Sequence, residues 1–531
     1  MKSQLKLYPF IVGISPILIL FASNLGEVEF SEIWRSLLGA ILLTALFLLV
    51  GWFLFRDWRK ASLLASIMMI SALTYGHIYD GLKETEFLIP FARHRFLLVL
   101  NVLLLLGFAW LLWKGIKHTE PLEAFFTWFS IFILIVPFYK IGSYYLFSDI
   151  RGSDTPTVSQ PGSIVIQNET RPDVYYIILD GYGRQDTLKE FYSFDNSEFV
   201  NELSQLGFYV APEATSNYPQ TLLSLGSSLN FQYIDESLLP VDPSSADRRE
   251  LTDKVLHSRV RQLFKDAGYD FVAFDTGYVT SVEDADIYYQ YQGPQKQGQT
   301  LFLSMNSFEG LLLEESIVRP LVDFGFTGQK SLASTLEAPY IRHGGRILFA
   351  FEKLAQIPSM DGDYFVLAHI IAPHPPFVFG KNGEFISHTT PYKLGDTTKY
   401  AGTRDEYIRD YTAEMTYINS LVLRTIKTIL SESETPPIII IQGDHGPGGY
   451  LDWASKENSN MQDRFSILNA YYLGGRESSL LYPSISPVNT FRVVLNEFFG
   501  MDMKLLPDRS FFSLWLTPFQ LEDVSQEVTG K

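Results

Sequence analysis

VYYIIL at Val174–Leu179, followed at once by DGYGR at Asp180–Arg184, decides the fold of this chain. Six aliphatic or aromatic residues in a row predict a strand that is buried on both faces, and the Asp-Gly pair after them predicts a tight turn. The runs YFVLAHII at Tyr364–Ile371 and PIIII at Pro437–Ile441 have the same character. Strands with two apolar faces are typical of parallel sheets that carry helices on both sides.

Helical patterns alternate with these strands. Phe199–Leu206 is amphipathic, Val260–Asp266 is helical ahead of an extended Tyr269–Phe274, and Arg404–Leu430 repeats apolar residues at helical spacing. This alternation predicts an α/β domain with a largely parallel, doubly wound central sheet. Polar sites in such sheets gather at the carboxyl ends of the strands. That rule selects Asp180 and the turn QGDHG at Gln442–Gly446.

Asp180, Asp444 and His445 are therefore expected to meet at one edge of the sheet. Two carboxylates and one imidazole are ligands that divalent cations such as Mn, Zn or Mg accept. Either motif alone is commonly a plain turn, so it is their pairing at neighbouring strand ends that indicates a metal site.

A third polar segment, SNYPQTLLSL at Ser216–Leu225, runs from a proline turn into a predicted helix start. A hydroxyl at a helix N-terminus gains from the helix dipole and from free amides, which also bind phosphate or sulfate. If a metal touches the hydroxyl of Thr221, the pKa of that hydroxyl falls and it becomes a nucleophile. The ordinary alternative is a helix cap.

The first 150 residues contain five apolar stretches close to the ~20 residues that a helix needs to cross a bilayer. They are Leu7–Ser23, Ile33–Phe55, Ala61–Tyr79, Phe96–Trp113 and Ala124–Phe147. No small-x-small cleavage site closes the first stretch, so it is expected to remain in the mature protein.

The loops predict the orientation, because cytoplasmic loops retain Lys and Arg. Positive residues precede the first stretch and fill the second-to-third and fourth-to-fifth connections (Lys2, Lys6, Arg56, Arg59, Lys60, Lys114, Lys117). Arg93 and Arg95, in the third-to-fourth connection, weaken the contrast. Five spans with the N-terminus inside place everything after residue 150 outside the cytoplasmic membrane.

Composition then suggests three regions. Residues 1–147 form a transmembrane domain, residues 148–171 have the Ser, Thr, Pro, Gly and Gln content of a linker, and residues 172–531 form an extracytoplasmic catalytic domain. The net charge of -17 and the lack of a basic patch argue against a nucleic-acid partner. The absence of cysteine excludes disulfides, thiolate metal sites and a cysteine nucleophile.

Four motifs in fixed order carry a family resemblance: ILDGYGR (178–184), NYPQTLLSL (217–225), HIIAPHPPF (369–377) and IIQGDHG (440–446). Together they resemble the alkaline phosphatase and sulfatase superfamily over roughly residues 172–500. With the membrane block in front, the chain is most similar to lipoteichoic acid synthases and related phosphoglycerol or phosphoethanolamine transferases. The resemblance implies an alkaline-phosphatase-like catalytic domain.

The resemblance also implies roles for single residues. Asp180 matches the first acidic metal ligand, where the lipoteichoic acid branch usually has Glu, and Asp444 with His445 matches the closing ligand pair. Thr221 matches the nucleophile, which also touches the metal. His374 matches a histidine that contacts the transferred group or assists the leaving group.

Other polar residues have less specific signals. Arg184, Asn217 and His343 are candidates for binding the substrate anion, and Arg464 is a further one, although charged residues on helices commonly lie on solvated faces. His369 lies within an apolar run and is expected to be a satisfied core histidine.

Departures from the superfamily narrow the chemistry. Common sulfatases carry Cys or Ser in a C/S-x-P-x-R motif, whereas Thr221 stands at that position here and no Arg follows at the required spacing. Two-metal members add a later histidine, but His445 is the last one in this chain. The expected cofactor is one divalent ion, Mn or alternatively Zn or Mg.

The predicted function is that of a multi-pass membrane enzyme with an external active site. It would transfer a phosphoglycerol or phosphoethanolamine group from a membrane lipid donor to an envelope glycan or lipid acceptor through Thr221. Two alternatives stay open: a hydrolase of phosphate or sulfate esters that uses the same site, and a catalytically silent binding protein.

Overall fold

The computed structural model describes residues 6–25, 28, 30–84, 86–116, 118–151, 171–235, 238–239, 241–293, 306–323, 330–388, 390, 392–396, 400 and 402–530. The chain divides into two compact units. Unit 1 comprises Met1–Pro156, Gln299–Pro339 and His388–Lys393, and unit 2 comprises Thr157–Gly298, Tyr340–Ser387 and Leu394–Lys531. Most of the predicted linker lies outside the described residues.

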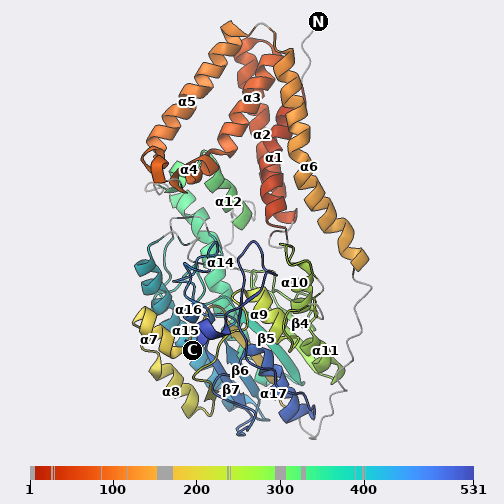
Figure 1. Cartoon of the computed structure of the whole chain (residues 1–531), viewed down its shortest axis with the longest axis vertical. Coiled ribbons are helices and arrows are strands. Elements are labelled where there is room, and N and C mark those ends of the chain that lie inside the picture. The colour runs from red at the N-terminus through yellow and green to blue at the C-terminus, as the bar shows by residue number, and fades with distance from the viewer. Residues whose placement is uncertain are drawn as a thin grey trace. The chain divides into compact units, whose positions relative to one another are not determined.

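Unit 1 is helical. Its elements are α1 (Tyr8–Ser23), α2 (Phe30–Phe55), α3 (Trp58–Leu73), α4 (Tyr75–Glu84), η1 (Glu86–Phe91), α5 (His94–Trp110), η2 (Leu111–Gly115), α6 (Glu120–Arg151), α12 (Ser307–Glu315) and α13 (Arg319–Asp323). Helix α1 packs against α2, α3 and α6, and these four lie side by side in Figure 1.

Three helices of the described chain are long and apolar enough to cross a membrane: Phe30–Phe55, His94–Gly115 and Glu120–Tyr145. A fourth crossing is counted if α3 and α4, which meet at a bend of 45°, form one broken span. The predicted first span is the 16-residue helix α1, shorter than the ~20 residues that the hydrocarbon layer requires. The structure thus supports three or four of the five predicted crossings by length, and it confirms a helical membrane unit.

One end of the helix bundle gathers residues that the sequence assigns to the cytoplasm. Lys6 lies 3.6 Å from Glu123, Arg59 lies 3.0 Å from Glu120, and the Lys60 ammonium donates to a carbonyl of η2. These contacts bring the start of α1, the α2–α3 turn and the α5–α6 connection together. Since α6 starts at this end, its C-terminus lies at the opposite end of the bundle (Figure 1).

The opposite end of the bundle holds α12 and α13, which arrive from far along the sequence. Phe308 is fully buried in a cluster with residues of α1, α2 and α3, and the Arg35 guanidinium binds both carboxylate oxygens of Glu309. Arg319 pairs in the same two-pronged way with Asp80 of α4. Buried apolar contact and paired charges together fix this segment to the bundle.

Unit 2 is built on a seven-stranded sheet in the order β2-β7-β6-β1-β5-β3-β4. The strands are β1 (Val174–Leu179), β2 (Tyr209–Val210), β3 (Asp270–Phe274), β4 (Ile287–Tyr289), β5 (Tyr364–Ile370), β6 (Ile438–Gln442) and β7 (Asn469–Leu473). Strands β6, β1, β5, β3 and β4 are parallel, whereas β7 runs antiparallel to β6 and β2. The predicted largely parallel sheet is confirmed, with β1 at its centre.

The helices of unit 2 are α7 (Gln185–Tyr192), α8 (Ser197–Gln205), α9 (Thr221–Ser228), α10 (Arg249–Leu256), α11 (Arg259–Asp266), the part of α14 (Lys330–Leu354) from Tyr340 on, η4 (Ile357–Ser359), α15 (Arg404–Glu432), α16 (Met461–Phe465), α17 (Pro487–Phe499) and α18 (Ser525–Thr529). A small separate sheet pairs β8 (Phe511–Phe512) with β9 (Glu522–Asp523).

Every residue of β1 is buried. Val174, Tyr176 and Ile178 join a core cluster with apolar residues of α9, α11 and α17. The alternating residues of β1 point to the opposite face and are as deeply buried, so the sheet is covered on both sides (Figure 1). This burial explains the uninterrupted apolar runs in the sequence.

Candidate metal centre

The polar cluster lies where the two central parallel strands end. In the β1–β6 pair Ile178 stands opposite Gln442, so Asp180 and Asp444 emerge at the same edge of the sheet. Gly181 adopts a φ of +71°, a left-handed conformation that suits glycine. Its amide donates to Oδ1 of Asp444 at 3.1 Å, which ties the two turns to each other.

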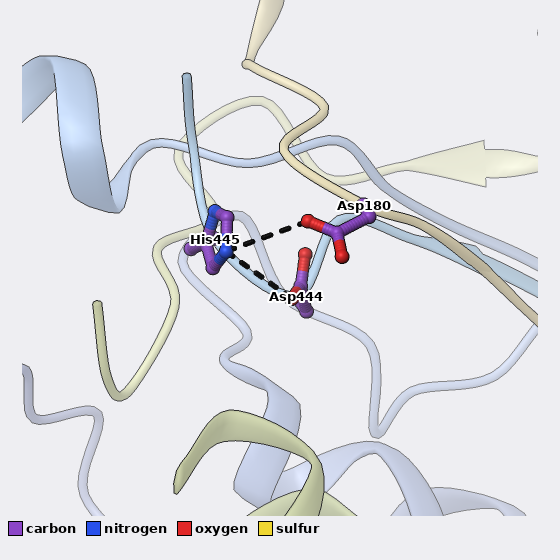
Figure 2. A group of neighbouring side chains, drawn as sticks. All are labelled: Asp180, Asp444 and His445. Carbon is purple, nitrogen blue, oxygen red and sulfur yellow. Dashed lines mark ion pairs between the residues drawn. The ribbon is translucent and has the colours of Figure 1, made fainter. Parts of the chain in front are cut away.

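Asp180, Asp444 and His445 form a group whose nearest ligand atoms all lie within 4.8 Å of one another. Nε2 of His445 is 3.5 Å from Oδ1 of Asp180 and 3.4 Å from Oδ2 of Asp444. Dashed lines mark these two pairs in Figure 2. All three side chains are buried. The three residues that the sequence singled out as ligands are therefore together.

The protonation pattern of this group fits a cation. Nδ1 of His445 faces the carbonyl oxygen of Gly446 at 2.9 Å and must carry the proton of a neutral ring, so Nε2 presents a lone pair. Oδ1 of Asp180 and Oδ2 of Asp444 are buried and have no hydrogen-bond donor among the described residues. Three electron-rich atoms that face one another repel unless a positive charge lies between them. The donor set suits a divalent metal.

Electrostatics favour the same state. Burial lowers the pKa of His445, and the charge of Arg464 lowers this pKa further, so the ring is neutral at pH 7. Burial alone would raise the pKa of Asp180, but the charge of His374 and a hydrogen bond from His369 outweigh it and hold this pKa below its usual range. A neutral imidazole beside an ionised carboxylate is what metal binding requires.

Thr221 is the first residue of α9 and lies next to this group. Its hydroxyl is 3.3 Å from Nε2 of His445. Ser224, one turn on, donates to the backbone carbonyl of Asp444 at 2.6 Å and so fixes α9 to the β6 turn. The N-cap residue is Gln220, which makes no side-chain cap, so the Thr221 hydroxyl is not used as a cap. Unlike its neighbours in α9, Thr221 is only partly buried.

His374 approaches the cluster from the turn after β5. Its ring centroid is 6.1 Å from that of His445. Nδ1 faces the carbonyl of Pro375 at 2.6 Å, and Nε2 faces Oδ1 of Asp396 at 3.4 Å. Burial would lower the pKa of His374, but the carboxylates of Asp180 and Asp396 raise it above its ordinary value. The two carboxylates thus favour the protonated form of the His374 ring.

Arg464, a candidate anion ligand in the sequence, is fully buried and engaged by the protein. Its guanidinium donates to the carbonyls of Pro219 at 2.9 Å and Gly446 at 3.2 Å, and it pairs with Asp396 at 3.0 Å. Pro219 lies two residues before Thr221, and Gly446 follows His445. Arg464 therefore ties the segment before Thr221 to the turn that carries Asp444 and His445.

The other candidate anion ligands have defined places. Both polar atoms of the Asn217 side-chain amide bind backbone: Nδ2 donates to the carbonyl of Arg509, and Oδ1 accepts from the amide of Val488. Arg184 pairs with Asp186 and donates to the carbonyl of Ala214. These bonds give Asn217 and Arg184 structural roles, and their part in substrate binding stays a prediction.

His343 is buried on α14, and its electrostatic surroundings include the active-site residues. Burial, the charge of Arg346 and the charge of His374 together lower the pKa of His343 to about 3. It is therefore a neutral imidazole and not a cationic anion ligand at neutral pH. Hydrogen bonding to a substrate remains open to it as a prediction.

Two further residues of the site were not singled out from the sequence. His369, expected to be a satisfied core histidine, is buried with both ring nitrogens partnered, and one of these partners is Asp180 at 3.1 Å. Asp396, which pairs with both His374 and Arg464, lies in a segment without helical or strand pattern, so nothing in the sequence signalled it. For His369 the spacing of five residues to His374 on a strand end was the available signal.

No family model matches the chain, and no curated protein matches it. Solved structures do match. The periplasmic domain of EptC from Escherichia coli in complex with Zn is 11% identical, covers 70% of this chain and 100% of that domain, and gives a TM-score of 0.43. The integral membrane lipooligosaccharide phosphoethanolamine transferase A from Neisseria meningitidis is 11% identical and covers 94% of this chain and 96% of that protein, with a TM-score of 0.37.

A 2-O GAG sulfatase, BT1596, is 11% identical, covers 66% of this chain and 74% of that protein, and gives a TM-score of 0.37. The structures that match the chain thus include phosphoethanolamine transferases and a sulfatase. All three TM-scores lie below 0.5.

Proposed function

We propose that this chain is a metal-dependent phospho-group transferase that acts on a membrane lipid outside the cytoplasmic membrane. The observation that carries the proposal is the convergence of the Thr221 hydroxyl, Nε2 of His445 and two buried carboxylate oxygens that have no donor in the described part of the chain. A hydroxyl in this place is a candidate nucleophile. The apolar helices of unit 1 would anchor the chain in the membrane, where lipid donors reside.

A divalent cation bound by Asp180, Asp444, His445 and Thr221 would lower the pKa of the Thr221 hydroxyl and neutralise charge on the phosphoryl oxygens. The free amides at the start of α9 add partial positive charge beside the same oxygens. Arg464 holds the two segments that carry these groups at a fixed spacing, which is the positioning that phosphoryl transfer depends on.

In the first half-reaction the Thr221 hydroxyl loses its proton to solvent, and its oxygen bonds to phosphorus. The bond from phosphorus to the lipid oxygen breaks, and His374 gives its proton to that oxygen, so diacylglycerol leaves. In the second half an acceptor hydroxyl bonds to phosphorus, its proton goes to His374, and the Thr221–phosphorus bond breaks. Thr221 regains a proton from solvent. His374 acts as acid and then as base.

Formylglycine chemistry has no support, because a threonine stands at the nucleophile position. Water as the acceptor would turn the same site into a hydrolase. A purified full-length chain in detergent, incubated with labelled phosphatidylglycerol or phosphatidylethanolamine, separates the two. Release of diacylglycerol only when a glycan or lipid acceptor is present supports transfer, whereas release in water alone supports hydrolysis.

Mass spectrometry of Thr221 after exposure to lipid extract tests the covalent step. We expect a mass of one phosphoglycerol or phosphoethanolamine group on Thr221, and no adduct in Thr221→Ala at unchanged metal content. Thr416→Ala is the control, because this exposed hydroxyl on α15 bonds only within its own helix. A chain that binds no metal and forms no adduct would instead be a catalytically silent binding protein.

A further inference from the structure

His369 is the next-to-last residue of β5, a strand whose every residue is buried. Packing alone accounts for burial but not for the contacts that its ring makes. Nε2 lies 3.1 Å from Oδ2 of Asp180, and Nδ1 lies 2.8 Å from the hydroxyl of Thr280. Both nitrogens therefore have polar partners inside an otherwise apolar layer.

The contact with Asp180 gives the two oxygens of its carboxylate different partners. An ionised carboxylate can only accept hydrogen bonds, so Nε2 of His369 must be the donor to Oδ2. The other oxygen, Oδ1, receives no hydrogen bond from any residue that the structure describes, and it faces Nε2 of His445 at 3.5 Å. One oxygen is thus fixed by the protein, and the second alone is free for a cation.

Thr280 belongs to a loop after β3 whose hydroxyl groups hydrogen-bond to one another and to the loop's backbone. The Thr276 hydroxyl lies 3.3 Å from that of Thr280 and 2.9 Å from that of Ser281, and it accepts from the amide of Tyr278 at 3.0 Å. Thr276 and Thr280 are both buried. A rigid loop therefore holds the Thr280 hydroxyl against the His369 ring and restricts its rotation.

We propose that His369 is a positioning residue of the metal site: held by Thr280, it orients Asp180 so that a single carboxylate oxygen faces the cation. The inference rests on the metal site of the proposed function. Removal of a group that hydrogen-bonds to a metal ligand and orients it typically lowers metal affinity by about 10–100-fold. A histidine that only filled space would leave affinity unchanged when replaced by a residue of similar bulk.

Three variants of the full chain test this proposal. His369→Leu keeps bulk and removes the donor, His369→Gln offers an amide N–H that can reach the position of Nε2, and Thr280→Val keeps shape and removes the hydroxyl. The measurement is the affinity for Mn²⁺ and for Zn²⁺, determined by competition with a chromophoric chelator, together with the thermal midpoint of the metal-free chain.

We expect a loss of affinity of about 10–100-fold in His369→Leu, a partial recovery in His369→Gln and a smaller loss in Thr280→Val, with no matching order in the metal-free midpoints. Wild-type affinity in His369→Leu, or no advantage of Gln over Leu, overturns the role of His369 and leaves the proposed function standing. Should His369→Leu fail to fold, wild-type affinity in Thr280→Val overturns it. A wild-type chain that binds neither metal overturns both.

Discussion

Glu414 offers a quantitative test of the loop that carries His374. It lies on α15 and is fully buried, and its Oε1 accepts from the amides of Val378 at 3.0 Å and Phe379 at 3.3 Å. Oε2 has no hydrogen-bond partner among the described residues. Burial raises the pKa of this carboxyl from 4.5 to about 8, against the lowering effect of the two amides.

The sign of the pH dependence follows from linkage. Between pH 4.5 and about 8 the folded chain keeps the proton of Glu414 and the unfolded chain has released it, so raising the pH favours unfolding. At pH 7 the cost is about 3 kcal/mol, because each of the ~2.5 pH units above the unfolded value contributes about 1.4 kcal/mol. Glu414→Gln keeps the acceptor for both amides and cannot ionise, so it escapes this cost.

We therefore expect Glu414→Gln to match the wild type near pH 4.5 and to become more stable as the pH rises. For a unit of this size, about 3 kcal/mol at pH 7 corresponds to a thermal midpoint about 5 °C higher. The measurement is the midpoint of the detergent-solubilised chain from pH 5 to 8. Glu432→Gln, at the exposed end of the same helix, is the matched control. A difference that stays constant with pH, or a variant less stable at pH 8, refutes the reasoning.

Four further outcomes follow from the structure. Removal of metal with EDTA should abolish turnover, and added Mn²⁺ or Zn²⁺ should restore it; full activity in metal-free protein would contradict the site. Arg464→Lys keeps the charge but cannot bridge the two backbone carbonyls, so kcat should fall about 10–100-fold, whereas exposed Arg424→Lys should behave as wild type. A protease site placed within residues 152–170 would cut the chain into two fragments, and these should co-elute because α12, on the second fragment, is docked in the helix bundle of the first. The substitution Phe308→Asp should let the two fragments separate. Separation of the fragments without this substitution would disprove the docking. A phosphodiester, bis(4-nitrophenyl) phosphate, should be turned over with a higher kcat/KM than the monoester 4-nitrophenyl phosphate, and the reverse order would favour a phosphatase.

The fold and the clustering of the candidate metal ligands could be predicted because their signals are local. A strand buried on both faces must be apolar throughout, so β1, β5 and β6 are visible as runs, and the polar residues that follow them share an edge by topology. Thr221 could be singled out from a local signal too, because its hydroxyl lies at a predicted helix start after a proline turn. Asp180, Asp444, His445 and Thr221 needed no knowledge of distant contacts.

The roles of His369 and Asp396 depend on contacts between residues far apart in the sequence, so they could not be predicted from local patterns. A hydrophobic run tells that His369 is buried but not that its ring meets Asp180. Asp396 lies in an irregular segment, and its pairing with Arg464 joins positions 68 residues apart. The return of α12 to unit 1 is likewise invisible, since hydropathy does not say which apolar surface a short helix covers. Hydropathy sums also ignore bends, so the sequence predicts one continuous span over Ala61–Tyr79, where the structure has α3 and α4 at an angle of 45°.

The charges around the site argue for a singly charged substrate. Asp180 and Asp444 together would balance one divalent cation, and His445 is neutral. Beside them, Arg464 and His374 share one carboxylate, Asp396; with His374 protonated, the form that its raised pKa favours, the net charge of this group is +1.

Asp463 adds little to this balance. Tyr192 and the amide of Tyr450 donate to it, and burial raises its pKa to about 7, so it carries only part of a charge at neutral pH. A phosphodiester monoanion would neutralise the remaining positive charge. A monoester dianion would leave a buried negative charge uncompensated, which is costly in a medium of low dielectric constant. Under the proposed function, the same charge balance favours a lipid phosphodiester over a monoester, because transfer through Thr221 would exchange one ester bond for another without a doubly charged substrate.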